Sequence, residues 1–304
     1  MVQMNISNIK DKYKIRKVLK YKTNLKQIKE ESKLNKYFLK FFCDNKSGFG
    51  DIFVVIDKDE NEYIMKIQKQ KIKKRNYILQ EYEIYEHLKG YDKISQYHDY
   101  FVCSNLRCLV IEKFDIDLKN LYNKDRIFFY SKQQEFIAKI FKILENIHNR
   151  DVIHGDVKFS NIMYNYKEDE IYMIDFGCSR MWEEKYIQFE KNKRISGTLR
   201  YASLNAHMGN CINNYNDIES LLYSILEIEL YPKQLLWRGR SRKANGLIER
   251  WSKIYKIKKK YLESHIKPRS MEKVFKYYKY QKKKTNENQV NYDNFIKLIE
   301  IKMY

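Results

Sequence analysis

The sequence runs His154-Gly155-Asp156-Val157-Lys158-Phe159-Ser160-Asn161 and, from residue 171, Ile171-Tyr172-Met173-Ile174-Asp175-Phe176-Gly177. The Asp156 carboxylate can accept a proton from a hydroxyl group, and Lys158 can lie beside a phosphoryl group during its transfer. Asn161 and Asp175 supply the hard oxygen ligands that Mg²⁺ prefers when it bridges phosphates. Asn161 and Asp175 are 14 residues apart, and the two stretches together predict a phosphoryl-transfer site.

A second group of residues, further upstream, fits the same chemistry. Ser47-Gly48-Phe49-Gly50 precedes a predicted strand, where a glycine-rich loop lets backbone amides approach phosphates. Lys66 lies inside the next predicted strand, and Glu81 follows 15 residues later on a predicted helix. We therefore expect a Lys66–Glu81 ion pair that orients the lysine toward the α- and β-phosphates of a nucleotide. Each feature alone is weak, and the prediction depends on their order and spacing.

The hydrophobic pattern divides the sequence into a strand-rich part and a helical part. Two β-rich runs at 51–56 and 62–67 flank a polar turn, and a further strand is predicted at 108–111. Helical spacing marks 76–89 and, after residue 115, a long helix that Ser131 is predicted to cap. A second, more apolar helix covers 221–228. No Gly-, Ser- or Pro-rich linker separates the parts, so the sequence predicts an α+β fold with two lobes.

On these residues the sequence resembles the eukaryotic-type protein kinases. More narrowly, it is similar to the casein-kinase-I superfamily, and within it to the vaccinia-related kinases and their poxviral serine/threonine kinase relatives. Four segments carry the narrower resemblance, which covers about residues 40–300. They are His154-Gly155-Asp156 where most kinases have His-Arg-Asp, Ser196-Gly197-Thr198-Leu199-Arg200-Tyr201-Ala202-Ser203-Leu204-Asn205-Ala206-His207 in place of Ala-Pro-Glu, Asn216-Asp217-Ile218-Glu219-Ser220-Leu221, and Asn291-Tyr292-Asp293-Asn294-Phe295.

The resemblance implies a bilobal kinase fold with assigned roles for individual residues. A basic extension at 1–35 would precede a β-rich N-lobe with one key helix at 36–114 and a larger helical C-lobe at 115–304. Asp156 would be the catalytic base, Lys158 would steady the γ-phosphate of ATP, and Thr198 would brace both side chains. Asn161 and Asp175 would hold Mg²⁺. Asp217 would bind the backbone of the catalytic loop. The residues implied in nucleotide binding are Ser47, Gly48, Phe49, Gly50, Lys66, Glu81, the gatekeeper Ile111, and Glu112, Lys113 and Phe114 of the hinge.

The implied activity is that of a monomeric, Mg²⁺-dependent serine/threonine protein kinase that transfers the ATP γ-phosphate to protein hydroxyls. Gly155 replaces the arginine that would bind a phosphorylated activation loop, which predicts activity without phosphorylation of that loop. Asn45 and Ser47 replace the first two glycines of the phosphate loop, so weaker nucleotide affinity is expected. The family reads acidic or prephosphorylated substrates through basic residues. Arg200 is kept for this role, whereas Glu190 and Ser241 lie near two other expected basic positions.

Lysine and arginine number 60 against 39 for aspartate and glutamate, which gives a formal charge of +21. The excess lies at the two ends, with +9 in 1–40, −3 in 41–230 and +15 in 231–304. Two interpretations stay open. The basic ends bind nucleic acid or another polyanion, or they are a solvated surface in a lysine-rich sequence. Because nearly every catalytic motif lies in the middle segment, the charge points to targeting or substrate docking rather than to the chemistry.

Composition argues against several classes of protein. The hydrophobic fraction of 43% argues against a disordered chain, and no apolar run is long enough to span a membrane. The N-terminus lacks a signal-peptide core, and five scattered cysteines suit neither a disulfide framework nor a zinc site. We therefore expect an intracellular protein, of the cytoplasm or the nucleus, rather than a secreted one.

Two alternatives remain for the site itself. Small-molecule kinases of the aminoglycoside or choline type also have His-Gly-Asp followed by asparagine five residues later, but they lack the lysine found at 158. A pseudokinase would keep the fold as a protein- or nucleic-acid-binding module, yet all the residues expected to carry the chemistry survive here. The remaining notable side chains are interpreted as structural, and these are His148, His154, Cys178, Trp182 and Trp237.

Overall fold

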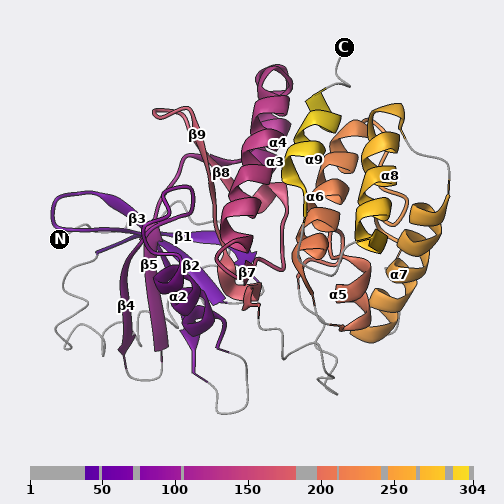
Figure 1. Cartoon of the computed structure of the whole chain (residues 1–304). Coiled ribbons are helices and arrows are strands. Elements are labelled where there is room, and N and C mark those ends of the chain that lie inside the picture. The colour runs from indigo at the N-terminus through magenta and orange to yellow at the C-terminus, as the bar shows by residue number, and fades with distance from the viewer. Residues whose placement is uncertain are drawn as a thin grey trace. The chain divides into compact units, whose positions relative to one another are not determined.

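A computed structural model describes 38–47, 50–70, 76–103, 106–182, 197–210, 212–240, 246–264, 268–284 and 290–300, with the backbone alone for 38–47, 103 and 300. These residues form two compact units. The first contains the described residues up to Tyr82 together with Gln96–Lys113. The second contains Glu83–Ser95 and the described residues from Phe114 onward (Figure 1). The lobe boundaries of the sequence analysis stay predictions, and the extension at 1–35 lies outside the described residues.

The first unit is built on an antiparallel sheet whose described strands follow the order β1-β2-β3-β5-β4. The strands predicted at 51–56, 62–67 and 108–111 are present as β2, β3 and β5, each extended by one to three residues. Helix α2 (Tyr77–His87) is the helix predicted at 76–89. The strands are β1 (Phe38–Ser47), β2 (Gly50–Ile56), β3 (Glu62–Lys69), β4 (Tyr97–Cys103) and β5 (Leu106–Glu112).

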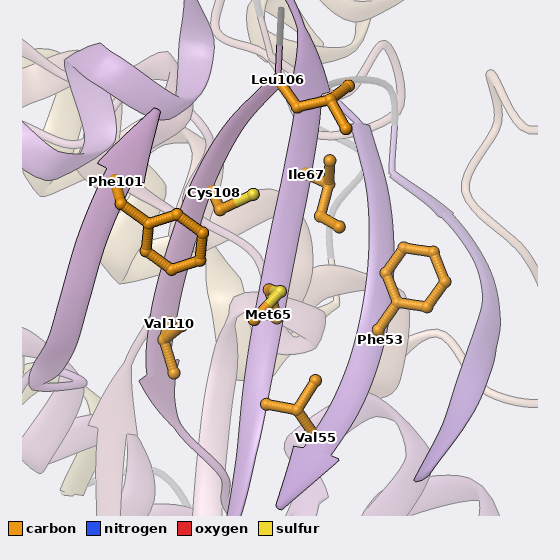
Figure 2. Close-up of a cluster of buried hydrophobic side chains, with 8 residues drawn as sticks. All are labelled: Phe53, Val55, Met65, Ile67, Phe101, Leu106, Cys108 and Val110. Atoms are coloured by element: carbon orange, nitrogen blue, oxygen red, sulfur yellow. The ribbon is translucent and has the colours of Figure 1, made fainter. Parts of the chain in front are cut away.

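A cluster of buried apolar side chains packs on one face of this sheet, as Figure 2 shows. Its members alternate along four neighbouring strands, and they are Phe53, Val55, Met65, Ile67, Phe101, Leu106, Cys108 and Val110. Burial of one such side chain stabilises the fold by about 1.5–3 kcal/mol. Because successive strand residues point to opposite faces, Lys66, between Met65 and Ile67, points away from this cluster. The alternation that builds the core therefore also directs the predicted site lysine.

The second unit is mainly helical (Figure 1), with α3 packed against α4 and α7 packed against α5. Helix α9 packs against α4 and α8, and α6 packs against α8 and α5. The apolar helix predicted over 221–228 is the central part of α6, where every residue from Asn214 to Ile228 is buried. The helices are α3 (Leu118–Lys124), α4 (Arg126–His148), α5 (Leu204–Met208), α6 (Asn214–Glu229), α7 (Leu247–Glu263), α8 (Arg269–Lys284) and α9 (Tyr292–Glu300).

Two small sheets and two short 3₁₀ turns of this unit hold the stretches that opened the sequence analysis. One sheet has the order β6-β8-β9, and the other pairs β7 with β10. The strands are β6 (Ile116–Asp117), β7 (Val152–Ile153), β8 (Ile162–Asn165), β9 (Glu170–Met173) and β10 (Arg180–Met181), and the turns are η3 (Phe159–Asn161) and η4 (Phe176–Cys178). A strand-rich first unit and a helical second unit confirm the predicted α+β fold.

The start of the long helix differs from the prediction. Helix α4 begins at Arg126, and its N-cap is Asp125, whose carboxylate accepts the Phe128 N–H at 2.9 Å. Ser131 lies inside the helix, where its hydroxyl donates to the Phe128 carbonyl at 2.8 Å. The prediction that Ser131 caps this helix is therefore wrong, because an aspartate six residues earlier in sequence accepts the free Phe128 N–H of the first turn. Within the described residues, no helix is both long and apolar enough to cross a membrane.

Candidate active site

Asp156 is the centre of a tight polar cluster in the second unit. One carboxylate oxygen accepts the Thr198 N–H at 2.7 Å, and the other accepts the Thr198 hydroxyl at 3.1 Å and the Lys158 ammonium at 2.6 Å. Lys158 also donates to the Thr198 hydroxyl at 2.7 Å. Asp156 is only 4% exposed, so its orientation is fixed. The sequence predicted that Thr198, 42 residues from Asp156, braces both side chains, and the structure brings the three residues together.

Asp217, at the start of α6, holds the loop that carries Asp156. Its carboxylate accepts the backbone N–H groups of His154 and Gly155 at 2.7 and 2.9 Å, and it is 1% exposed. His148 Nε2 lies 3.0 Å from the same carboxylate, and His148 Nδ1 bonds to the Tyr292 hydroxyl of α9. This contact to the loop backbone is the one predicted for Asp217. His148, predicted to be structural, links the end of α4 to α6 and α9.

His154 fixes the same loop from its other side. Its Nδ1 accepts the Asp156 N–H at 3.2 Å, so the neutral ring donates from Nε2 to the Ile174 carbonyl, 3.1 Å away. The ring also packs against Phe176, with centroids 5.0 Å apart. His154 therefore ties the loop that carries Asp156 to the segment that precedes Asp175, which is the structural role expected for it.

Gly155 occupies a position that a side chain would strain. Its φ is +77°, and a Cβ placed there would lie 2.7 Å from the Cys178 carbonyl oxygen. A side chain at Gly197 would be strained in the same way, since the φ of Gly197 is +88° and a Cβ there would lie 2.8 Å from the Gly155 carbonyl oxygen. The arginine that most kinases carry at 155 is thus excluded by local backbone geometry as well as absent from the sequence. Cys178 itself is 1% exposed, as expected for an inert thiol.

Asn161 and Asp175 are the residues predicted to hold Mg²⁺. The Asn161 amide nitrogen donates to the Asp156 carbonyl at 3.0 Å, which leaves the amide oxygen as the atom that can face a cation. The Ile174 N–H donates to the Asn161 carbonyl at 2.9 Å, so the residue before Asp175 is fixed beside Asn161. Asp175 adopts a left-handed φ of 69° at the start of η4. A carboxylate and an amide oxygen from adjacent backbone segments fit the hard-ligand preference of Mg²⁺.

The first unit contains the other predicted ion pair. Lys66 Nζ of β3 lies 2.7 Å from Glu81 Oε1 of α2, and the two side chains are 10% and 3% exposed. Gly50 starts β2 so close to β3 that a Cβ would lie 2.5 Å from the Ile67 carbonyl oxygen. Ser47 pairs with Gly50 in the backbone register, whereas Gly48 and Phe49 lie outside the described residues. The predicted phosphate loop is therefore described at its two ends only.

The predicted gatekeeper Ile111 and the predicted hinge residues Glu112, Lys113 and Phe114 lie at and directly after the end of β5. Ile111 is 2% exposed, and the Glu112 N–H donates to the Gln96 carbonyl at 3.0 Å. Phe114, in the second unit, stacks on Tyr172 with centroids 4.5 Å apart and is 7% exposed. The backbone of this stretch is thus fixed by strand pairing on one side and by an aromatic stack on the other. Contact of these residues with adenine stays a prediction.

Lys258, which contacts the segment after Thr198, was not singled out by the sequence. Lys258 of α7 is fully buried and donates to the carbonyls of Ala202 and Leu199 at 2.6 and 3.3 Å. Burial lowers the pKa of Lys258 well below its ordinary value. Trp237, predicted to be core, is 2% exposed and donates to the Arg200 carbonyl at 2.8 Å, while Trp182 is half-buried. These contacts fix the segment that follows Thr198, and no local sequence signal distinguishes Lys258 from its neighbouring lysines.

The protein kinase domain family matches residues 46–299 of this chain. The chain belongs to the protein kinase family. A probable casein kinase I homolog of Encephalitozoon cuniculi is 34% identical over 198 residues, which are 63% of this chain and 61% of that protein. A probable serine/threonine-protein kinase of Fowlpox virus is 28% identical over 43% of this chain and 44% of its own length. The human serine/threonine-protein kinase VRK2 is 31% identical over 40% of this chain and 25% of its own length.

These relatives confirm the narrower resemblance that the four segments predicted. The kinase domain is similar to a casein kinase I homolog, a poxviral kinase and a vaccinia-related kinase, and the last two are serine/threonine-protein kinases by name. The match spans 61%, 44% and 25% of the lengths of these three relatives. The chain therefore spans less than two thirds of the length of each of these three relatives.

Proposed function

We propose that this kinase domain transfers the γ-phosphoryl group of ATP to serine and threonine hydroxyls of protein substrates in a Mg²⁺-dependent reaction. The observation that carries the proposal is the Asp156–Lys158–Thr198 cluster, with all its contacts between 2.6 and 3.1 Å. The serine/threonine class of the poxviral and human relatives supports the choice of acceptor. The alternative, a pseudokinase, would make no use of so closely braced a carboxylate.

The geometry suits Asp156 to the role of general base. Each carboxylate oxygen can accept two hydrogen bonds, and the oxygen bonded to the Thr198 N–H keeps capacity for an incoming hydroxyl. The acceptor oxygen would form a bond to the γ-phosphorus while the bond to the leaving ADP oxygen breaks, and the hydroxyl proton would pass to Asp156. Lys158, held between Asp156 and Thr198, would offer positive charge to the transferring group. Asn161 and Asp175 would hold Mg²⁺, which neutralises phosphate charge when bound.

The test is a transfer assay with γ-labelled ATP and Mg²⁺, using casein and a basic protein as acceptors, followed by phosphoamino-acid analysis. We expect label on serine and threonine and its loss when EDTA removes the divalent cation. Label on tyrosine would contradict the proposed acceptor class. No incorporation into any acceptor of a broad panel would favour the pseudokinase alternative instead.

Lys66 gives a prediction for the nucleotide side of the reaction. Lys66→Met removes the ammonium group that Glu81 orients at 2.7 Å, so kcat/KM for ATP should fall on the order of tenfold to a hundredfold. Lys58→Met is the matched control, because Lys58 is an exposed residue of the turn between β2 and β3 in the same unit. Steady-state kinetics over a range of ATP concentrations measures both variants. Equal losses for the two would contradict a specific role for Lys66.

Gly155 gives a prediction about regulation. With no side chain at 155 to pair with a phosphate, the purified protein should stay active after phosphatase treatment of the segment 178–200. Residues 183–196 of this segment lie outside the described residues. Mass spectrometry before and after the treatment establishes its phosphorylation state, and the transfer assay measures its activity. Loss of activity on dephosphorylation would show that another basic group reads the loop.

A further inference from the structure

A cavity of about 480 Å³ opens beside Asp156 in the second unit. Thr198 and Lys158, which contact Asp156 directly, form part of its wall. The remaining wall carries a strong positive charge from Lys119, Arg200 and Arg238. A protein segment that presents its hydroxyl to Asp156 therefore places neighbouring residues in or near this basic pocket, which comprises Lys119, Lys158, Thr198, Arg200, Trp237 and Arg238 with their neighbours.

Glu227 of α6 lies beneath three of these cations. Its Oε2 accepts Lys119 at 2.9 Å and the Tyr201 hydroxyl at 2.6 Å, and its Oε1 lies 3.1 Å from Arg200 and 3.9 Å from Arg238. The Glu227 side chain is 6% exposed, whereas Lys119, Arg200 and Arg238 are 25%, 35% and 43% exposed. The carboxylate is thus buried behind the wall of the pocket, and the three cations that pair with it reach from it toward solvent.

The protonation state of Glu227 follows from its contacts. Burial alone would raise its pKa, but hydrogen bonds from Tyr201 and Lys119 outweigh burial and hold the pKa below its ordinary value. Glu227 is therefore ionised at neutral pH. Each cation of the pocket then has an internal partner, since Lys158 pairs with Asp156 and the other three pair with Glu227. An anionic group on a substrate must compete with these two carboxylates for the same donors.

We propose that Glu227 is a specificity-determining residue that lowers the preference of this kinase for acidic and phosphorylated substrates by acting as a built-in counter-ion in the basic pocket. The inference rests on the proposed function, because it concerns the substrates of that same site. Rejection by a like charge is an effective way to discriminate between partners that share all other contacts. Without Glu227, three cations would face an incoming carboxylate or phosphate without an internal competitor.

The size of the effect follows from the charge that is removed. A unit charge at roughly 7 Å, with an effective dielectric constant of about 40 for a partly exposed site, changes the binding of an anion by about tenfold. Loss of the charge should leave chemistry at Asp156 unchanged, because Glu227 contacts the pocket wall and not the Asp156 cluster. The change should therefore appear in KM for acidic peptides and not in kcat.

The test compares Glu227→Gln with wild type on matched peptides. A fluorescent peptide with one phosphoserine near the acceptor serine, and its unphosphorylated twin, are titrated by anisotropy without nucleotide. A second pair of peptides carries glutamate or a neutral residue in place of the phosphoserine. Both pairs are then used as substrates in the transfer assay. We expect the variant to bind the phosphopeptide about tenfold more tightly, and to raise the acidic-to-neutral ratio of kcat/KM about tenfold through KM. Binding of the unphosphorylated twin should not change.

Glu229→Gln is the matched control, because Glu229 lies on the same helix and accepts hydrogen bonds from Gln133 and Ser270, outside the pocket wall. It should change neither ratio. Glu227→Met is a second variant that removes the charge without placing an amide N–H beside Arg200. Lys119, Arg200 and Arg238 contact solvent, so water can hydrate them in both variants. We therefore expect tighter phosphopeptide binding in each Glu227 variant that folds.

The outcomes separate this inference from the proposed function. Weaker or unchanged phosphopeptide binding in the Glu227 variants would overturn the inference, and would mean that the carboxylate gathers the cations rather than competing for them. Failure of the wild type to phosphorylate any peptide would instead overturn the proposed function. The anisotropy measurement remains valid in that case, since it requires no catalysis.

Discussion

Asp156→Asn is expected to lower kcat by about 10²- to 10⁴-fold with the fold retained. The amide has nearly the shape of the carboxylate, and its oxygen can still accept the Thr198 N–H at 2.7 Å. It cannot take a proton from the acceptor hydroxyl, and its nitrogen would face the Lys158 ammonium that now lies 2.6 Å from the second oxygen. Transfer of label from γ-labelled ATP to casein or a basic protein measures the loss.

The control for Asp156→Asn is another aspartate-to-asparagine substitution, placed outside the candidate active site. Asp293→Asn serves, because Asp293 is an exposed residue of α9 that pairs with Lys142 and has no part in the Asp156 cluster. Near-wild-type activity in Asp293→Asn and a matching thermal melting curve for Asp156→Asn assign the loss to the chemistry. If Asp156→Asn transferred phosphate as well as wild type, the assignment of the base, and with it the proposed mechanism, would fall.

Asp217→Ala is expected to lower the free energy of unfolding by about 2–6 kcal/mol. The variant leaves the buried N–H groups of His154 and Gly155 without their acceptor, and each such unsatisfied group costs about 1–3 kcal/mol. For a domain of this size the melting temperature should fall by about 10 °C. Activity should fall with it, because the same two amides orient the loop that carries Asp156.

A graded series strengthens this prediction. Asp217→Asn keeps one acceptor oxygen, so its melting temperature should lie between those of wild type and Asp217→Ala. Asp92→Ala, in which the aspartate is 80% exposed and 3.8 Å from Lys93, should melt like wild type. Calorimetry or circular dichroism measures all three. An Asp217→Ala variant with an unchanged melting temperature would show that water replaces the carboxylate at no cost.

The sequence predicted those parts of the site that local spacing governs. The catalytic loop and the segment around Asp175 are each closed by short-range contacts, such as the Asn161 amide on the Asp156 carbonyl. The alternation in β3 placed Met65 and Ile67 in the core and directed Lys66 to the opposite face. The Lys66–Glu81 pair was predicted from the order and spacing of the two residues, and the structure has it at 2.7 Å. In these stretches, contacts between residues close in sequence determine the local structure.

The burial of Lys258 and the ion pairs of Glu227 could not be predicted, because they depend on contacts between residues far apart in the sequence. Lys258 lies among four exposed or half-buried lysines of α7, and its burial is decided by the carbonyls of Leu199 and Ala202, 59 and 56 residues away. Glu227 likewise meets Lys119 across 108 residues of sequence. The wrong prediction of Ser131 as the cap of α4 has a different cause. Asp125 and Ser131 are both residue types that often cap helices, and the sequence does not show which of them precedes the first turn.

The contact between His148 and Tyr292 has a consequence for the order of assembly. Tyr292 is translated 144 residues after His148, so the hydroxyl that supports the Asp217–His148 pair is among the last parts of this domain to leave the ribosome. The described strands of the first unit can pair while the rest is still being made, because all of them have been translated once Glu112 is reached. The catalytic loop, in contrast, gains its full support only after α9 has been synthesised and packed against α4. The loop that carries Asp156 is therefore expected to become fully supported late in the synthesis of this domain, after the sheet of the first unit has formed.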